Sequence, residues 1–465
     1  MNFRSVYAHA RGLTAPGPRG GLVLGNLRDL WRDGMHRVLS DAWMRYGDLV
    51  SIRFGAKVVY LVVRPEHVHH ILVGNRDNYN KQSHRARPLI GDGLPASNGE
   101  LWKRQRSLLQ PRFQSRFMPQ FAGDIQNAIA CVAERWGTCA DRGQPLNISV
   151  EMTRLTLDAI VRSMTSERLV DEDSELRDAI RTAIEFVAAS GQVFRLPLGL
   201  PTPANIRFSR ALSVIDAFIA KAIQAQERRP AESSLLTFLL NARDEEDRGM
   251  PKQLVRDEAV NLLLAVHEST AQALCWVWYL LDTHRDVRKR MHEEIDSTLA
   301  GRIPTVDDRG KLPWMSAVIQ EALRLYPPFW VFPRHAINDD RIGGHLVPAG
   351  ATMMLCPYFT HRLPELWEEP ERFRPERFLD GSAQARLHRA SYYPFGYGQR
   401  TCIGNHLATM EMQLVVAMLA QKFELTCSPS APPVEPEFST ALRPRGGLWM
   451  RVRRRHMPAH PSQIR

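Results

Sequence analysis

The chain has 465 residues, and its 61 Lys and Arg residues exceed its 50 Asp and Glu residues, so its formal net charge is +11. Such an excess would suit nucleic acid, but no basic motif interleaved with aromatic residues accompanies it. The basic run at residues 451–455 is typical of a solvated chain end. We therefore expect no nucleic-acid partner and interpret the charge as a face for an acidic protein.

Length alone would allow two or three domains, but no linker composition, repeat or low-complexity run divides the chain. We expect one domain over residues 1–465, with 1–20 as a flexible lead-in and 456–465 as a flexible tail. The start carries no long apolar run, which predicts neither a signal peptide nor a membrane anchor. Six cysteines without a C-x-x-C pair argue against a zinc site or a disulfide framework and fit the reducing cytoplasm.

The first predicted elements are a helix and a β-hairpin. Residues 31–46 have the spacing of an amphipathic helix that ends at Gly47. Two β-rich runs, 49–54 and 58–63, flank a turn, which predicts a hairpin. Residues 78–100 are polar and contain glycine and proline, which predicts a long loop. Long loops in compact domains are commonly functional.

A short helix over residues 101–109 follows this loop. It carries Trp102 and Arg106 on one face, because residues four apart on a helix are neighbours. An indole N–H and a guanidinium suit a carboxylate, although a surface stack of the two side chains is the simpler interpretation. Residues 121–189 have helical spacing throughout. The proline-rich apolar segment 194–203 interrupts it and fits either a lid for a lipophilic ligand or a buried turn.

The longest predicted helix covers residues 251–281 and would extend about 45 Å. Glu268 and Ser269 lie in its apolar middle, where polar groups need a reason to be buried. One interpretation is an acid–alcohol pair that orders water and relays protons. The other places Glu268 on the outer face and bonds Ser269 to the preceding turn.

Further along, Glu321 and Arg324 are three apart on a predicted helix, a common spacing for a surface ion pair worth a few tenths of a kcal/mol. An apolar run, 329–332, then enters a strand that carries Arg334.

The glycine-rich loop at residues 393–404 presents Cys402 and leads directly into a helix. The N–H groups and dipole of a helix N-terminus favour the thiolate, the form of cysteine that binds metals. Gly398 and Gly404 would let the backbone approach a flat ligand, and Arg400 would place a cation beside an anionic group on it. An inert thiol and a catalytic nucleophile remain alternatives on the loop alone.

The spacing Phe395-x-x-Gly398-x-Arg400-x-Cys402-x-Gly404 resembles the haem-ligand signature of the cytochrome P-450 superfamily. The pairs at 102 and 106 and at 321 and 324 resemble the family's W-x-x-x-R and E-x-x-R motifs. The segment Pro375-Glu376-Arg377-Phe378 resembles its P-E-R-F segment. These motifs occur in family order, and the resemblance covers nearly the whole chain.

The resemblance implies a mainly α fold with a smaller β region, in which haem b is buried between the long central helix and the helix after the cysteine loop. It makes Cys402 the thiolate ligand of the iron, which favours O–O cleavage. The other residues that it places at the haem are Trp102, Arg106, Arg334, Phe395, Arg400 and Gly404. The tryptophan and the three arginines would bind the propionates. Glu321, Arg324 and Arg377 would form a buried structural charge network.

The long helix matches the family pattern A-G-x-[DE]-T-[TS] at Ala265, Glu268 and Thr270. Ser269 replaces the usual threonine and keeps the hydroxyl. Val266 replaces the usual glycine, and its β-branched side chain fills space beside the oxygen site. The resemblance implies that Glu268 and Ser269 deliver protons during oxygen activation.

Taken together, the resemblance implies a haem-thiolate monooxygenase of the soluble bacterial type, in secondary metabolism. It would use O2 to hydroxylate or epoxidise a lipophilic small molecule such as a terpenoid, a polyketide or a fatty acid. The segments 78–100, 194–203 and 329–332 would line the pocket. The sequence has no flavin or ferredoxin-like segment, so electrons would come from an acidic ferredoxin-like protein and its reductase.

Two alternatives stay open. A peroxide-using or rearranging haem enzyme is possible because of Val266, although the surviving acid–alcohol pair argues against it. A non-enzymatic haem protein, such as a sensor or a ligand carrier, would not need that pair.

Overall fold

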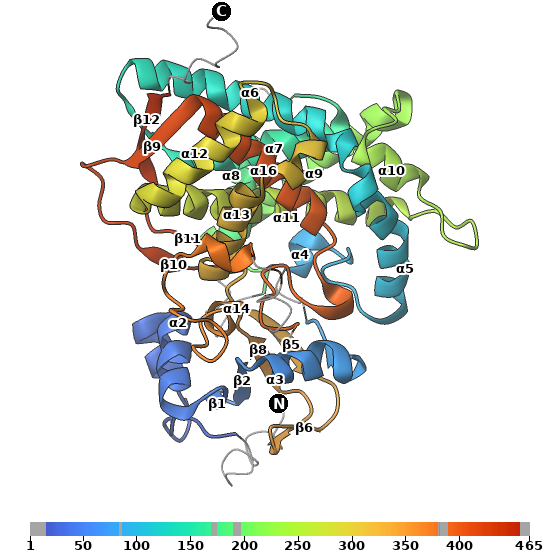
Figure 1. The fold of residues 1–465 in the computed structure, drawn as a ribbon. Coiled ribbons are helices and arrows are strands. Elements are labelled where there is room, and N and C mark those ends of the chain that lie inside the picture. The colour runs from blue at the N-terminus through green and yellow to red at the C-terminus, as the bar shows by residue number, and fades with distance from the viewer. Residues whose placement is uncertain are drawn as a thin grey trace, which may run out of the picture. The chain divides into compact units, whose positions relative to one another are not determined.

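The computed structural model describes residues 15–82, 86–168, 174–188, 197–379, 381 and 389–455. Contacts divide the chain into two compact units. The first, which we name the β unit, comprises Met1–Gln82, Leu323–Arg372 and Asp380–Cys402. The second, the helical unit, comprises Ser83–Ala322, Phe373–Leu379 and Ile403–Arg465. Helices dominate the described chain and the sheets are small, which confirms the expected fold class (Figure 1).

The β unit is built on a five-stranded sheet with the order β1-β2-β8-β5-β3. Its strands are β1 (Leu49–Phe54), β2 (Lys57–Val62), β3 (Tyr79–Asn80), β5 (Phe332–Ala336) and β8 (Thr352–Leu355). The predicted hairpin forms, with Leu49 opposite Val62 and Phe54 opposite Lys57. Strand β8 then pairs with β2 in parallel, which brings together segments almost 300 residues apart.

The remaining elements of the β unit are short, apart from one helix. They are α2 (Leu27–Tyr46), α3 (Pro65–His69), a π-helical turn (His70–Gly74), a 3₁₀ turn (Arg76–Asn78), β6 (Asp340–Ile342), β7 (His345–Val347), α14 (Pro357–Thr360) and a 3₁₀ turn (Gly398–Arg400). Helix α2 ends at Gly47 as predicted, because that residue has φ +91°. It begins four residues earlier than predicted, at Leu27, and Gly34 breaks its helical backbone with φ +76°.

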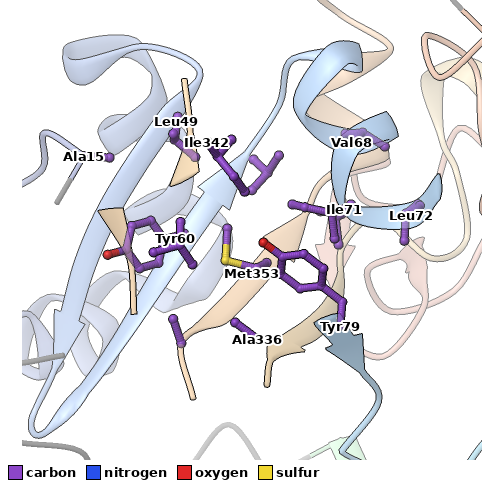
Figure 2. Packing of buried hydrophobic residues seen from close by; sticks show 14 of the residues in the cluster. Ala15, Leu49, Tyr60, Val68, Ile71, Leu72, Tyr79, Ala336, Ile342 and Met353 are labelled. Carbon is purple, nitrogen blue, oxygen red and sulfur yellow. The ribbon is translucent and has the colours of Figure 1, made fainter. Parts of the chain in front are cut away.

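One face of this sheet is covered by apolar side chains from segments distant in sequence (Figure 2). Tyr60 and Met353 come from β2 and β8, and both are fully buried. Ile71 and Leu72 come from the π-helical turn after α3 and pack into the same cluster. Burial of this face sets the register of the strands, because a slip by one residue would turn these side chains to solvent.

The helical unit contains most of the helices. They are α4 (Arg87–Ile90), α5 (Gly99–Leu109), α6 (Pro119–Asp141), α7 (Ile148–Thr165), α8 (Ser174–Ala188), α9 (Pro203–Arg228), α10 (Leu235–Asn241), α11 (Lys252–Thr283), α12 (Arg285–Leu299) and α16 (Asn405–Lys422). Helix α13 (Pro313–Leu325) carries the chain boundary between the two units. The 3₁₀ turns are Gln110–Phe113, Ser115–Phe117, Val306–Lys311 and Pro375–Phe378. Helix α11 packs against α7, and none of the helices in the described ranges is long and apolar enough to cross a membrane.

Two small sheets complete the helical unit, and one of them corrects a prediction. They are β4-β12-β9, with β4 (Pro145–Asn147), β12 (Trp449–Arg454) and β9 (Phe423–Cys427), and β10-β11, with β10 (Pro436–Phe438) and β11 (Leu442–Pro444). The prediction of helix throughout 121–189 is wrong at β4. This strand pairs with β12, some 300 residues away, so local periodicity could not reveal it.

The long loop predicted over residues 78–100 is also only partly correct. Strand β3 and the single helical turn α4 lie within it, and α5 begins before its predicted end. Residues 1–14 of the expected lead-in and the whole expected tail fall outside the described residues. Ala15 is buried, and the Pro16 carbonyl accepts the Ser51 N–H at 2.9 Å, so the chain packs onto β1 from there onward.

Candidate active site

In the β unit, the loop around Cys402 is held by its own backbone. The Cys402 N–H donates to the Phe395 carbonyl at 2.8 Å, which closes the loop. The Thr401 N–H and hydroxyl both donate to the Gly398 carbonyl, at 3.0 and 2.6 Å. Phe395 and Arg400 are half-buried, whereas Cys402 is exposed. These bonds fix the backbone of the loop, and Cys402 is accessible within it.

Gly398 is required by a close approach within the same unit. It has φ +74°, and a Cβ at this position would lie 2.5 Å from the Leu72 carbonyl oxygen and 3.2 Å from the Val73 side chain. Tyr397, the preceding residue, is 3.2 Å from the His69 ring nitrogen through its hydroxyl. The loop backbone is thus pressed against the segment that follows α3.

Arg334 on β5 is a buried cation without an acidic partner among the described residues. Only 7% of the residue is exposed. Its guanidinium donates to the Pro333 carbonyl at 2.8 Å and lies over the Phe332 ring, 5.1 Å from the centroid. Burial, together with the charge of Arg400, lowers the pKa of Arg334 to about 10. Two neighbouring cations, one of them buried, call for an anionic ligand, which fits the carboxylates of haem.

In the helical unit, α5 carries the predicted Trp102 and Arg106. Trp102 is buried at 7% exposure, and Arg106 is half-buried with its Nε donating to the Gln110 side chain at 3.1 Å. Gly404 caps α16, and its carbonyl accepts the Ala408 N–H at 2.9 Å. Helix α16 thus begins at Asn405, three residues after Cys402 rather than at it.

The middle of α11 carries the predicted acid and alcohol. Ser269 is half-buried, and its hydroxyl donates to the Ala265 carbonyl at 2.8 Å, so the bond to the preceding turn does form. Its oxygen can still accept a hydrogen bond. Burial raises the pKa of the half-buried Glu268, and Arg443 of β11 opposes that shift. Val266, at the usual glycine position, is half-buried.

A third polar residue on α11, Thr270, also matches the family pattern. The Thr270 hydroxyl oxygen is buried and has no hydrogen-bond partner within the part of the chain that the structure describes. The sequence does carry one signal for Thr270, namely a hydroxyl in the apolar middle of a helix. A buried hydroxyl ordinarily needs a hydrogen-bond partner. Strand β11 is fastened to α11 nearby, because the Trp276 indole donates to the Leu442 carbonyl at 2.9 Å.

The structure gives bonded partners to each residue of the predicted charge network. Within the helical unit, Glu321 is fully buried and accepts from the Arg374 N–H at 2.9 Å and from the Arg377 Nε at 3.3 Å. Within the β unit, Arg324 is also fully buried and donates to backbone carbonyls. Those carbonyls belong to His361 and Pro370, both at 2.7 Å, and to Arg372, at 3.2 Å.

Three residues that the sequence did not single out connect Arg324 to the cysteine loop. His361 lies 3.3 Å from the Arg324 carbonyl through Nδ1, and its Nε2 accepts the Tyr393 N–H at 2.9 Å. Burial lowers the pKa of His361 well below its usual range, which keeps Nε2 available as an acceptor. The Tyr393 hydroxyl is 2.9 Å from that of Thr360. No spacing in the sequence reveals these contacts, because they join residues about 30 apart.

The segments expected to line the pocket contain both exposed and buried apolar residues. Residues 194–196 lie outside the described residues, and the turn that follows exposes Leu198 and Leu200. Asn205 holds that turn by donating to the Pro197 and Leu200 carbonyls, both at 2.9 Å. In the run 329–332, Phe329 is exposed and Trp330 is buried.

Comparison with known proteins identifies the family. The family model for Cytochrome P450 matches residues 15–450. The chain is 34% identical to cyclooctat-9-en-7-ol 5-monooxygenase of Streptomyces melanosporofaciens, over 89% of each protein. It is 33% identical to cyclooctatin synthase of the same organism, over 86% of each. It is 30% identical to pentalenene oxygenase of Streptomyces avermitilis, over 93% of this chain and 95% of that protein.

A solved structure agrees with these sequences. The crystal structure of the cytochrome P450DA heme domain superposes with a TM-score of 0.86 and 25% identity, over 95% of this chain and 98% of that one. The chain therefore belongs to the cytochrome P450 family and is a monooxygenase whose cofactor is haem with a cysteine thiolate as the axial ligand.

Proposed function

We propose that this monooxygenase hydroxylates or epoxidises a cyclic terpenoid and that Cys402 is its haem ligand. The observation that carries the second part is the loop in which a backbone bond to Phe395 holds Cys402 while Cys402 stays accessible. The substrate class is supported by the relatives, whose names refer to cyclooctat-9-en-7-ol, cyclooctatin and pentalenene. Both units belong to one P450 domain in this proposal, since the family model spans them.

Haem bound through a thiolate supplies an iron centre at which dioxygen is reduced and its O–O bond is cleaved. The protein's part is to bind, orient and deliver protons. Arg334 and Arg400, with Trp102 and Arg106, would bind the propionates, and Phe395 and Gly404 would lie against the ring. The support is the buried charge of Arg334 beside Arg400, for which the described residues supply no acidic partner.

Protons would be delivered by Glu268 and Ser269. A carboxyl group whose pKa is raised by burial retains its proton to higher pH, so Glu268 can hold the proton that the reaction consumes. The Ser269 oxygen can accept a hydrogen bond from water while its own proton is bonded to Ala265.

We expect Glu268→Gln to lower the rate of product formation by about 10²-fold, because an amide cannot relay a proton. The measurement is product formed per reduced cofactor consumed, across pH. Since Arg443 lowers the pKa of Glu268, Arg443→Gln should move the pH limb that Glu268 controls to higher pH. Glu268→Gln should remove that limb. Unchanged yields in both Glu268→Gln and Ser269→Ala would show that the pair is no relay.

Replacing Arg334 should stabilise the apoprotein but weaken the binding of haem. Arg334→Met removes a buried charge that has no acidic partner in the described part of the chain, so the apoprotein should gain about 1–3 kcal/mol in free energy of unfolding. Loss of a charge-assisted bond should speed haem transfer to an apo-globin by about 10- to 100-fold. Arg341→Met, at an exposed arginine, is the control and should change neither. A destabilised apoprotein would contradict the anion-binding role.

The electron donor in this proposal is an acidic ferredoxin-like protein with its reductase. The support is the net charge of +11. Opposite charges speed the encounter of two proteins, so reduction by such a donor should slow steeply as salt is added.

The experiment that tests the substrate class is an absorbance titration of the ferric protein with cyclic terpenoids, polyketides and fatty acids. We expect a shift from low to high spin with the terpenoids, because a ligand over the haem displaces the axial water. A shift with fatty acids alone would overturn the substrate class and leave the haem assignment intact. Turnover with peroxide, without reductase, would favour the peroxygenase alternative.

A further inference from the structure

A turn within the helical unit is fastened to the first part of α11 by side chains of that helix. The Asp92 N–H donates to the Asp257 carboxylate at 2.9 Å, and the Leu94 N–H donates to that of Glu258 at 2.8 Å. The Asn261 side chain donates to the Ile90 carbonyl at 3.3 Å. The turn comprises residues 90–94. We use the name clasp for this turn together with the three side chains that hold it. Helices α4 and α11 lie side by side here (Figure 1).

Neighbouring helices reinforce the clasp. Arg256 donates to the Leu89 carbonyl at 3.0 Å, and it pairs with Asp257 at 3.0 Å and with Asp216 of α9 at 2.8 Å. From α5, the fully buried Gln105 donates to the Asp92 carbonyl at 2.9 Å. Side chains of α11 and α5 therefore hold one short turn, and α9 supports it through Arg256.

The turn lies this close to α11 only because it contains glycine. Gly91 has φ +56°, and a Cβ there would lie 2.0 Å from the Asp257 carboxyl group. A Cβ on Gly93 would lie 1.9 Å from the Asn261 side-chain nitrogen. A larger residue at either position would displace the turn or the Asp257 and Asn261 side chains that hold it.

The clasp contains two adjacent buried acids. Asp257 is 3% exposed and Glu258 is 2% exposed. Burial raises the pKa of Glu258 to about 7 from an ordinary 4.5. The charge of Asp257 acts in the same direction, and the Leu94 N–H opposes both. In the described part of the chain, the charged groups near the two acids include Arg256, Asp216, Asp92 and Arg87, of which Arg256 pairs with Asp257 and Arg87 with Asp92.

The place of the clasp on α11 connects it to the site. Asn261 is one helical turn, about 6 Å, before Ala265, and Glu258 is about 15 Å before Glu268. The clasp therefore precedes the predicted acid–alcohol pair on the same helix.

We propose that the clasp is a pH-sensitive closure of the ligand site, in which Asp257 and Glu258 are positioning residues and ionisation of Glu258 releases the turn. The statement that the clasp closes a ligand site rests on the proposed function. In the closed state Glu258 is surrounded by protein and keeps its proton, whereas an open turn exposes the carboxyl group to water, where it ionises. Opening is therefore favoured as the pH rises through neutrality.

Hydrogen exchange tests the closure directly in the holoenzyme. The opening equilibrium, read from exchange of the 89–96 backbone amides after division by the intrinsic rate, should rise about tenfold from pH 6 to pH 8. In Glu258→Gln, which keeps an acceptor oxygen for Leu94 but cannot ionise, this dependence should vanish. If the wild type shows no such dependence, or the variant retains it, the proposal is overturned.

A pair of glycine variants tests the role of the closure in ligand binding. Gly91→Ala and Gly99→Ala both place a Cβ on a residue of positive φ, +56° and +57°, but no atom lies within 4 Å of a Cβ at Gly99. The dissociation rate of a spin-shifting terpenoid should rise at least about tenfold in Gly91→Ala and stay near wild type in Gly99→Ala. Equal rates in the two variants, with pH-dependent exchange intact, would overturn the ligand closure. If the reduced, carbon-monoxide-bound wild type shows no thiolate-type spectrum, the proposed haem site is refuted instead.

Discussion

Cys402→Ser is expected to abolish the thiolate-type absorbance of the reduced, carbon-monoxide-bound protein and to lower monooxygenase turnover by more than about 100-fold. That loss exceeds the 10- to 100-fold typical of changes to groups that only support a metal ligand. The physical reason is that a serine hydroxyl does not ionise near neutral pH and cannot replace the thiolate. The fold should survive, because the Cys402 side chain is exposed and its backbone bond to Phe395 does not need sulfur.

Two further variants make this result specific. Cys139→Ser changes a half-buried thiol on α6 and should leave spectrum and turnover unchanged. Cys402→His should retain bound haem, since imidazole is a good ligand, but without the thiolate-type band. A thiolate-type spectrum in Cys402→Ser would show that another cysteine is the ligand.

Glu321→Gln is expected to lower the free energy of unfolding by about 3 kcal/mol and to reduce the haem content of the purified protein. Glu321 is fully buried and accepts bonds from Arg374 and Arg377. The amide still offers an acceptor oxygen, but the charge opposite Arg377, whose side chain is only 10% exposed, is lost. Loss of one charge from a buried ion pair is the costly change. The measurement is urea unfolding of the apoprotein together with the haem-to-protein ratio.

The matched control for Glu321 is Glu376→Gln, in the same P-E-R-F segment. Its side chain is 53% exposed and lies 3.9 Å from Arg290, so the change should stay within about 0.5 kcal/mol. The double variant Glu321→Met with Arg377→Met should lose less than the sum of its single variants, because both members of the pair are removed together. Additive losses would show that Glu321 and Arg377 are not coupled.

Some residues of the site can be predicted from local sequence motifs, and others cannot. The sequence alone singles out Cys402, because a glycine-rich loop followed by a helix is a local pattern with a local cause. It does not indicate His361, whose ring links Arg324 to Tyr393 through bonds between residues some 30 apart. The pairing of Arg377 with Glu321 follows from motifs, whereas the backbone carbonyls that receive the Arg324 guanidinium emerge only from tertiary contacts.

The sequence by itself determined the elements whose cause is local. The end of α2 at Gly47, the β1–β2 hairpin and the long helix α11 follow from side-chain periodicity and from the backbone freedom of glycine. Only the tertiary structure decided which segments meet. The parallel pairing of β8 with β2, the strand β4 and the closure of residues 90–94 on α11 all join positions more than 150 residues apart. Such contacts depend on which buried surfaces and polar groups complement each other after folding, and no periodicity in a single segment carries that information.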